Sequence, residues 1–153
     1  MLHRNTQVRS TLLTFEYPED LHFFATFLTG SDEIKLEKEY GDYFDFRDPM
    51  KKRKEFNLLR KHLLPVLMER DKGHCQLTFE GCEIDKNIVV DHLIPLSSNK
   101  LNRKLRGHVM TNGKKPKTQS FGSNNEKNLI LACTHCNSQK KHRLFNPRTR
   151  ELI

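Results

Sequence analysis

The chain has 153 residues and a mass of 18.1 kDa, which fits one domain, or a domain of about 100 residues with an appendage, and excludes a multidomain assembly. Its 27 Lys and Arg outnumber its 19 Asp and Glu, so the net charge is +8, which favours a polyanion over a neutral small molecule as partner. Neither a signal peptide nor an apolar run of about 18 residues is visible, so we expect an intracellular protein without a membrane partner.

The charge is unevenly distributed along the chain. Residues 1–50 hold 5 basic and 10 acidic residues, net −5, whereas residues 51–153 hold 22 basic and 9 acidic residues, net +13. We therefore divide the chain into an acidic, aromatic-rich region over 1–50 and a basic domain over 51–153. The acidic region is interpreted either as a solvated surface or as a contact for a homodimer or a protein partner.

The first predicted helix begins at Pro18, which is followed by two acidic residues, and ends at Gly30. A second acidic segment has a candidate cap at Ser31 and a stop at Gly41. From Met50 onward, apolar residues recur at helical spacing, which predicts an amphipathic helix. Proline disfavours a helix interior, so we expect this helix to end near Leu64 and a shorter one to run from Pro65 to about Asp71.

Two short runs rich in β-branched residues, 87–95 and 128–133, are each long enough for one strand. Between them the pattern predicts a helix that carries Leu101 and Leu105 and stops at Gly107. A long basic loop follows it. Between Lys100 and Arg143 there are eleven Lys and Arg and one acid, Glu126, so this stretch is the predicted nucleic-acid surface.

The four cysteines form two pairs. Cys133 and Cys136 are separated by two residues, and Cys75 and Cys82 by six. In a reducing compartment such pairs are read as metal ligands, and four thiolates suit a closed tetrahedral site for structural Zn²⁺. Unrelated buried thiols, or a three-cysteine site completed by His74, are the alternatives. Zinc binding, of order 10 kcal/mol, would compensate for an apolar content of only 35%.

Three segments, CQLTFEGC, VVDHLIPLS and NEKNLILACTHCNSQK, together resemble the HNH endonuclease family and its ββα-metal motif. The resemblance covers about residues 66–143, roughly half of the chain. Asn follows the second cysteine pair, as in a subset of that family. The wide spacing of Cys75 and Cys82 and the long segment between Asp-His and Asn128 depart from compact members, which leaves the substrate preference open.

The resemblance implies an α+β fold in which a zinc-stapled ββα-metal domain follows N-terminal helices. It implies hydrolysis of phosphodiester bonds in nucleic acid, with double-stranded DNA as the expected substrate. By this resemblance His92 is the general base and Asn128 orients it. Asp91 and Asn137 would be the ligands of a catalytic divalent ion, Mg²⁺ or another.

These roles are chemically consistent. A neutral imidazole with a pKa near 6.5 can take a proton from water, and a sparse oxygen site suits Mg²⁺. Adjacent residues on a strand point to opposite faces, so the strand must end, twist or bulge at Asp91 and His92 if both serve one centre. A helix from about Thr134 would bring Asn137 and Lys140 to one side.

The residues predicted to contact nucleic acid are basic and lie in the stretch from Lys100 to Arg143, in the long loop or on the last predicted helix. They are Arg103, Lys104, Arg106, Lys114, Lys115, Lys117, Lys140 and Lys141. Two competing functions remain open: a non-catalytic zinc module that binds nucleic acid, and the nuclease subunit of a restriction, defence or phage assembly that docks through residues 1–50.

Overall fold

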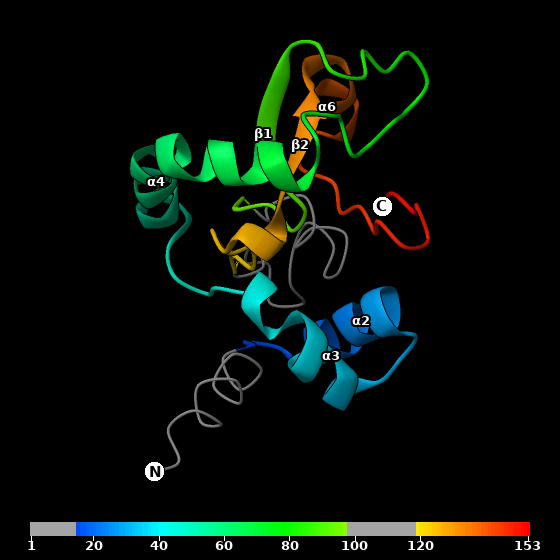
Figure 1. Cartoon of the computed structure of the whole chain (residues 1–153). Coiled ribbons are helices and arrows are strands. Elements are labelled where there is room, and N and C mark those ends of the chain that lie inside the picture. The colour runs from blue at the N-terminus through cyan, green and yellow to red at the C-terminus, as the bar shows by residue number, and fades with distance from the viewer. Residues whose placement is uncertain (1–14, 98–118) are drawn as a thin grey trace, which may run out of the picture.

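The computed structural model describes residues 15–97 and 119–153 and has an α+β architecture (Figure 1). Its elements, in chain order, are α2 (Pro18–Thr29), α3 (Glu33–Tyr40), η1 (Gly41–Tyr43), α4 (Pro49–Arg70), β1 (Ile88–His92), η2 (Glu126–Asn128), β2 (Leu129–Cys133) and α6 (Thr134–Lys140). The helix predicted around Leu101 and Leu105 and most of the basic loop lie outside the described residues.

The first two helices begin and end for local reasons. Pro18 stands at the start of α2, and Gly30 ends it in the left-handed conformation, with φ of 80°, as the sequence predicted. The cap of α3 is Asp32 rather than the expected Ser31. The Asp32 carboxylate accepts a hydrogen bond from the Lys35 N–H, and a negative charge is favourable at this positive end of the helix.

Helix α4 is continuous over 22 residues, so the prediction of two helices divided at Pro65 is wrong. Proline removes one N–H from the helix and leaves the Lys61 carbonyl without its usual donor. Both residues are exposed, so water can satisfy that carbonyl. Figure 1 shows the helix bending rather than ending, which is the usual consequence of an internal proline.

Strands β1 and β2 form a two-stranded antiparallel sheet with Ile88 opposite Cys133 and His92 opposite Leu129. One face packs against α4, where Leu129 and Leu131 meet buried residues of that helix. The other face carries Ile130 and packs against the cysteine-bearing segments. A pair of five-residue strands is only marginally stable alone, so both faces need these partners.

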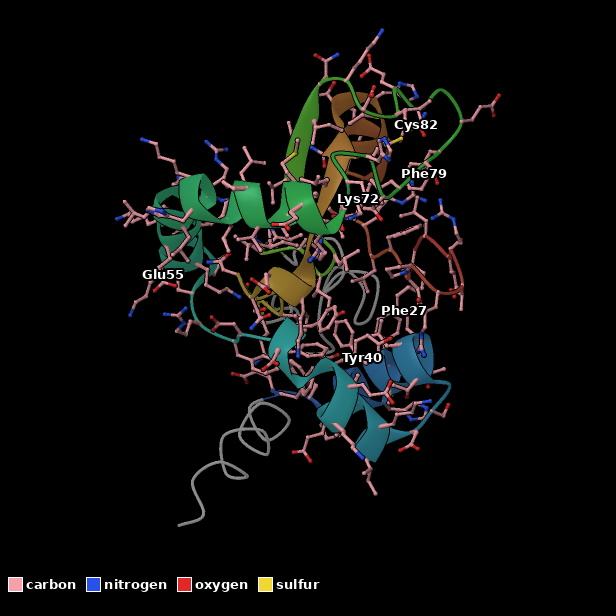
Figure 2. The ribbon with its side chains drawn as sticks, viewed as in Figure 1. Phe27, Tyr40, Glu55, Lys72, Phe79 and Cys82 are labelled. Carbon is pink, nitrogen blue, oxygen red and sulfur yellow. The ribbon has the colours of Figure 1, made fainter. Side chains whose placement is uncertain are left out.

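The N-terminal helices share their core with later parts of the chain. Phe24 and Phe44 are buried together with Ile94, Phe121 and Leu144, so residues on both sides of position 50 contribute to one apolar cluster. The backbone joins them as well: segment 43–45 runs antiparallel to segment 121–123, bonded by Asp45 N–H to the Phe121 carbonyl at 2.8 Å. In Figure 2 the labelled Phe27 and Tyr40 lie on the side of α2 and α3 that faces the rest of the molecule.

Lys52 is a buried cation at the start of α4. Its ammonium donates hydrogen bonds to the carbonyls of Asp45 and Gly122, the latter at 2.6 Å. Burial lowers the pKa of Lys52 to about 8. The residue thus ties α4 to the segment that precedes β2, at the cost of removing a charge from water.

Raising the pH should reduce the free-energy cost of burying the Lys52 charge. Between pH 8 and the ordinary pKa of 10.5, Lys52 stays protonated in the unfolded chain but loses its proton in the folded one. The free energy of unfolding should therefore increase across this range through Lys52, by up to about 3 kcal/mol, because the neutral amine still donates to both carbonyls. Urea unfolding from pH 7.5 to 10.5 measures it in the parent chain, in Lys52→Met and in the exposed neighbour control Lys51→Met. Parallel curves for the parent and Lys52→Met would contradict the assignment.

Candidate functional site

The four cysteine sulfurs come together at one point. The sulfurs of Cys75, Cys82, Cys133 and Cys136 all lie within 4.8 Å of one another, and none forms a disulfide. In a tetrahedral site with Zn–S bonds of about 2.3 Å, the sulfurs are about 3.8 Å apart. The Cys82 and Cys133 sulfurs already lie 3.9 Å apart. The cluster can therefore hold a metal ion such as zinc with only a small contraction.

Backbone N–H groups favour a thiolate at Cys133, whereas burial raises the pKa of Cys82. The Glu83 and Cys136 N–H groups donate to the Cys133 sulfur, each at 3.4 Å, and the Ile84 N–H donates to the Cys82 sulfur at 3.3 Å. Burial raises the pKa of the Cys133 thiol, but these N–H groups and the neighbouring cysteines outweigh it and lower the pKa to about 7. Burial raises the pKa of Cys136 instead. Four thiolates would thus need a cation among them.

The loop that carries Cys82 packs closely against α6. Gly81 has a φ of 85°, and a Cβ on it would lie 2.6 Å from Nε2 of His135. The same His135 nitrogen bonds to the Glu80 carbonyl at 2.9 Å. Position 81 therefore favours glycine for two reasons: the backbone has a positive φ, and a side chain would collide with His135 of α6.

The metal assignment is tested by Cys82→Ser. A serine hydroxyl is a poor zinc ligand, so we expect loss of the bound equivalent of zinc and a large drop in melting temperature, because the loop of residues 71–87 is then no longer fastened to α6. Zinc content and thermal unfolding, with and without a chelator, measure both effects. Ser138→Ala, an exposed change on the same helix, is the control. A Cys82→Ser protein that keeps its zinc and its melting temperature would contradict the four-cysteine site.

The second feature is the end of β1, where Asp91 and His92 point to different elements. The His92 ring packs edge-on against Phe56 of α4, with ring centroids 4.7 Å apart. The Asp91 carboxylate turns to α6, where Oδ2 lies 2.9 Å from the Lys140 ammonium in an ion pair. Because His92 is the last residue of the strand, the two side chains stay at one corner of the sheet despite this alternation.

Among the described residues, a hydrogen bond to Asn124 orients the His92 ring. Nε2 lies 2.9 Å from Oδ1 of Asn124, whose Nδ2 donates to the Lys52 carbonyl at 2.8 Å. The second bond assigns the amide orientation, so Oδ1 accepts, Nε2 carries the hydrogen and Nδ1 keeps its lone pair. The residue that orients His92 in this structure is thus Asn124.

His92 is held neutral. Burial, which leaves the residue 8% exposed, is the main cause that lowers the pKa of His92 to about 4. The Asn124 bond and the Asp91 charge act in the opposite direction, whereas the charges of Lys140 and Arg53 lower the pKa further. At neutral pH the imidazole is therefore uncharged and able to accept a proton.

Asn128, the residue expected to orient His92, makes other contacts. Its side chain is fully buried and bonds to the Ile94 N–H and carbonyl and to the Ser123 carbonyl. Its own carbonyl accepts from the Leu93 N–H at 2.8 Å. All its bonds go to backbone groups, so Asn128 fixes the path of the chain just beyond His92 rather than the ring itself.

The predicted residues of α6 fall into two groups. Lys140 is completely buried and donates to the His92 carbonyl at 2.8 Å, so it is not available to a phosphate, contrary to the sequence-based expectation. Lys141 is exposed. Asn137 is half-buried and one turn before Lys140, which places it on the face of α6 that meets Asp91. The predicted contacts from Arg103 to Lys117 lie outside the described residues.

Sequence reasoning missed Asn124, Phe56 and Lys52. Asn124 belongs to the run SNNEKN before β2, where polar residues that turn the chain are common, and only the fold distinguishes it from Asn125. Phe56 and Lys52 lie in α4. The spacing of apolar residues in that helix predicts a buried face but does not indicate which residues it packs against.

Comparisons with known proteins provide no relative for this chain: no family model, no curated protein and no solved structure matches it. Among the described residues, no helix has both the length and the apolar character needed to cross a membrane.

Proposed function

We propose that the chain is a metal-dependent endonuclease that hydrolyses phosphodiester bonds of nucleic acid, with DNA as the expected substrate. The observation that carries the proposal is His92, which is buried and neutral and whose Nε2 is bonded to Asn124. Its neighbour Asp91 faces α6. The strand–strand–helix order, the four cysteines and the resemblance to the HNH motif support a ββα-metal arrangement.

The imidazole can act as general base. With the hydrogen on Nε2 held by Asn124, Nδ1 is the atom that takes a proton from the attacking water. The bond also stabilises the imidazolium that forms, because the amide oxygen remains an acceptor for the charged ring. The low pKa of His92 keeps the base unprotonated well below neutral pH.

Asp91 and Asn137 are the residues that would hold a divalent ion. The Asp91 side chain is 18% exposed and lies at the end of the strand beside Lys140, so its carboxylate could also bind a cation from the solvent side. One carboxylate and one amide oxygen fit Mg²⁺, which is usually bound through few protein oxygens. Such an ion supplies charge stabilisation for the phosphate and the leaving oxygen.

Lys140 holds the two parts of the site together. Its ammonium contacts both the Asp91 carboxylate and the His92 carbonyl, so it couples the ligand to the backbone of the base. A completely buried lysine with these two partners acts as a positioning residue.

The base assignment is tested by His92→Ala. We expect Mg²⁺-dependent cleavage of supercoiled plasmid to fall about 10²- to 10⁴-fold, because proton transfer contributes on that order, while zinc content and DNA affinity persist. His22→Ala, an exposed histidine on α2, should cut like the parent. Cleavage by His92→Ala at the parent rate would refute the mechanism.

The orienting role of Asn124 is tested by its alanine and aspartate variants. Removing the acceptor should slow cleavage about 10- to 100-fold, as for other residues that orient a reacting group. In Asn124→Asp a carboxylate next to Nε2 should raise the pKa of His92, so the acidic limb of the pH–rate profile should move to higher pH.

The control for this pair is Asn125→Ser, which keeps an oxygen to cap the Lys127 N–H. An unchanged pH–rate profile in Asn124→Asp would show that the residue supports only the fold.

A non-catalytic zinc module that binds nucleic acid is the alternative from another class. It predicts DNA binding without any ends produced in Mg²⁺, and such a module has no need for a neutral buried histidine beside a carboxylate. A nuclease subunit of a larger assembly predicts cleavage that requires a partner docked on residues 1–50. Plasmid cleavage by the purified chain separates the three functions.

A further inference from the structure

The N-terminal half of α4, together with the turn that follows it, carries a set of exposed cations. No hydrogen bond or ion pair of their side chains occurs within the part of the chain that the structure describes. The one acid among them, Glu55, bonds to Arg47 at 2.6 Å instead. Figure 2 shows nitrogen-tipped side chains extending outward from this half of the helix. The cations are Lys51, Arg53, Lys54, Arg60 and Lys61.

This set differs from several other basic residues of the described structure, such as Arg70 and Arg150, which have internal partners. Arg70 bonds to Asp71 and to two carbonyls, and Arg150 bonds to the Leu77 carbonyl and the Thr78 hydroxyl. Those guanidinium groups hold the fold together. The cations of α4 do not, and five like charges on one exposed helix repel one another unless an anion binds them.

One of the cations, Arg53, lies beside the proposed base, and a second, Arg60, lies on the same side of the helix. Arg53 and Arg60 are seven positions apart, so they lie on the same side of α4, two turns or about 10 Å from each other. Phe56, three positions after Arg53, is the residue that contacts the His92 ring. The influence of Arg53 on the pKa of His92 agrees with this proximity.

Part of the expected nucleic-acid surface, from Lys100 to Arg143, lies within the described residues. There Lys140 is buried and bonded to Asp91 and His92, Lys127 is paired with Asp42, and Lys141 and Arg143 are exposed. The concentration of free positive charge that the structure places next to His92 is therefore on α4.

We propose that Arg53 and Arg60 on α4 bind backbone phosphates of the nucleic acid and hold it against His92. The inference rests on the proposed function in one respect, the identity of the substrate as nucleic acid. Guanidinium groups suit this role because they stay charged and bond two phosphate oxygens at once. Contacts of this kind position the backbone and carry no base specificity.

The experiment measures DNA affinity as a function of salt, in a His92→Ala background without Mg²⁺ so that no cleavage interferes. For duplex DNA, each phosphate contact contributes about 0.9 to the slope of log K against log salt. Arg53→Gln/Arg60→Gln should therefore weaken binding and reduce the slope by about 1.8. Lys35→Gln/Lys38→Gln on α3 removes the same charge elsewhere and should leave the slope unchanged. Circular dichroism and zinc content establish that all variants are folded.

Each result decides the proposal. An equal reduction of the slope in both double variants, or no reduction in either, would overturn it, because α4 would then contribute no specific contact. Absence of DNA binding by the parent would overturn both this inference and the endonuclease. Binding that depends on Arg53 and Arg60, combined with no cleavage by the parent in Mg²⁺, would leave the α4 surface intact and refute only the catalysis.

Discussion

The convergence of four sulfurs is the constraint on which the basic half of the structure depends. The segment of residues 71–87 contains no helix or strand, α6 has seven residues, and each strand has five. None of these pieces is stable by itself. A metal held by cysteines from the 71–87 segment, the end of β2 and α6 would close them into one unit, and the same closure would keep the inner face of α6 next to Asp91.

A second chain of contacts connects His92 to the N-terminal helices. His92 bonds to Asn124, Asn124 bonds to the Lys52 carbonyl, and the Lys52 ammonium bonds to Asp45 and Gly122. The acidic first part of the chain therefore has a structural role, because its aromatic core and its backbone support the segment that holds the imidazole. Asp32 and Asp48 add caps at two helix starts.

Local chemistry explains which features the sequence could predict. Both strands, the end of α2 at Gly30 and the start of α6 depend on neighbouring residues, and these predictions are confirmed. The spacing of the cysteines predicted that the two pairs meet, and their sulfurs do lie together. The effect of Pro65 was misjudged because the free-energy cost of a proline inside a helix depends on whether the Lys61 carbonyl, which loses its donor, can reach water. Only the fold decides this. Asn124 was missed, and Lys140 was expected to contact phosphate, for a related reason. The type of a residue indicates which bonds its side chain can make. Packing in the fold decides which partner it meets and whether water reaches it.

The path of the chain around residues 97–119 has a consequence for how such a protein can change. The Ser120 hydroxyl bonds to the Leu96 carbonyl, and the Gly122 backbone lies so close to Ile94 that a Cβ there would meet its carbonyl oxygen. The parts of the chain on either side of residues 98–118 therefore lie next to each other. Doubling the length of a flexible segment that joins two adjacent points costs only about 0.6 kcal/mol in closure entropy. Insertions, deletions or exchange of this segment can accordingly accumulate over evolution while the strand end with Asp91 and His92 stays as it is.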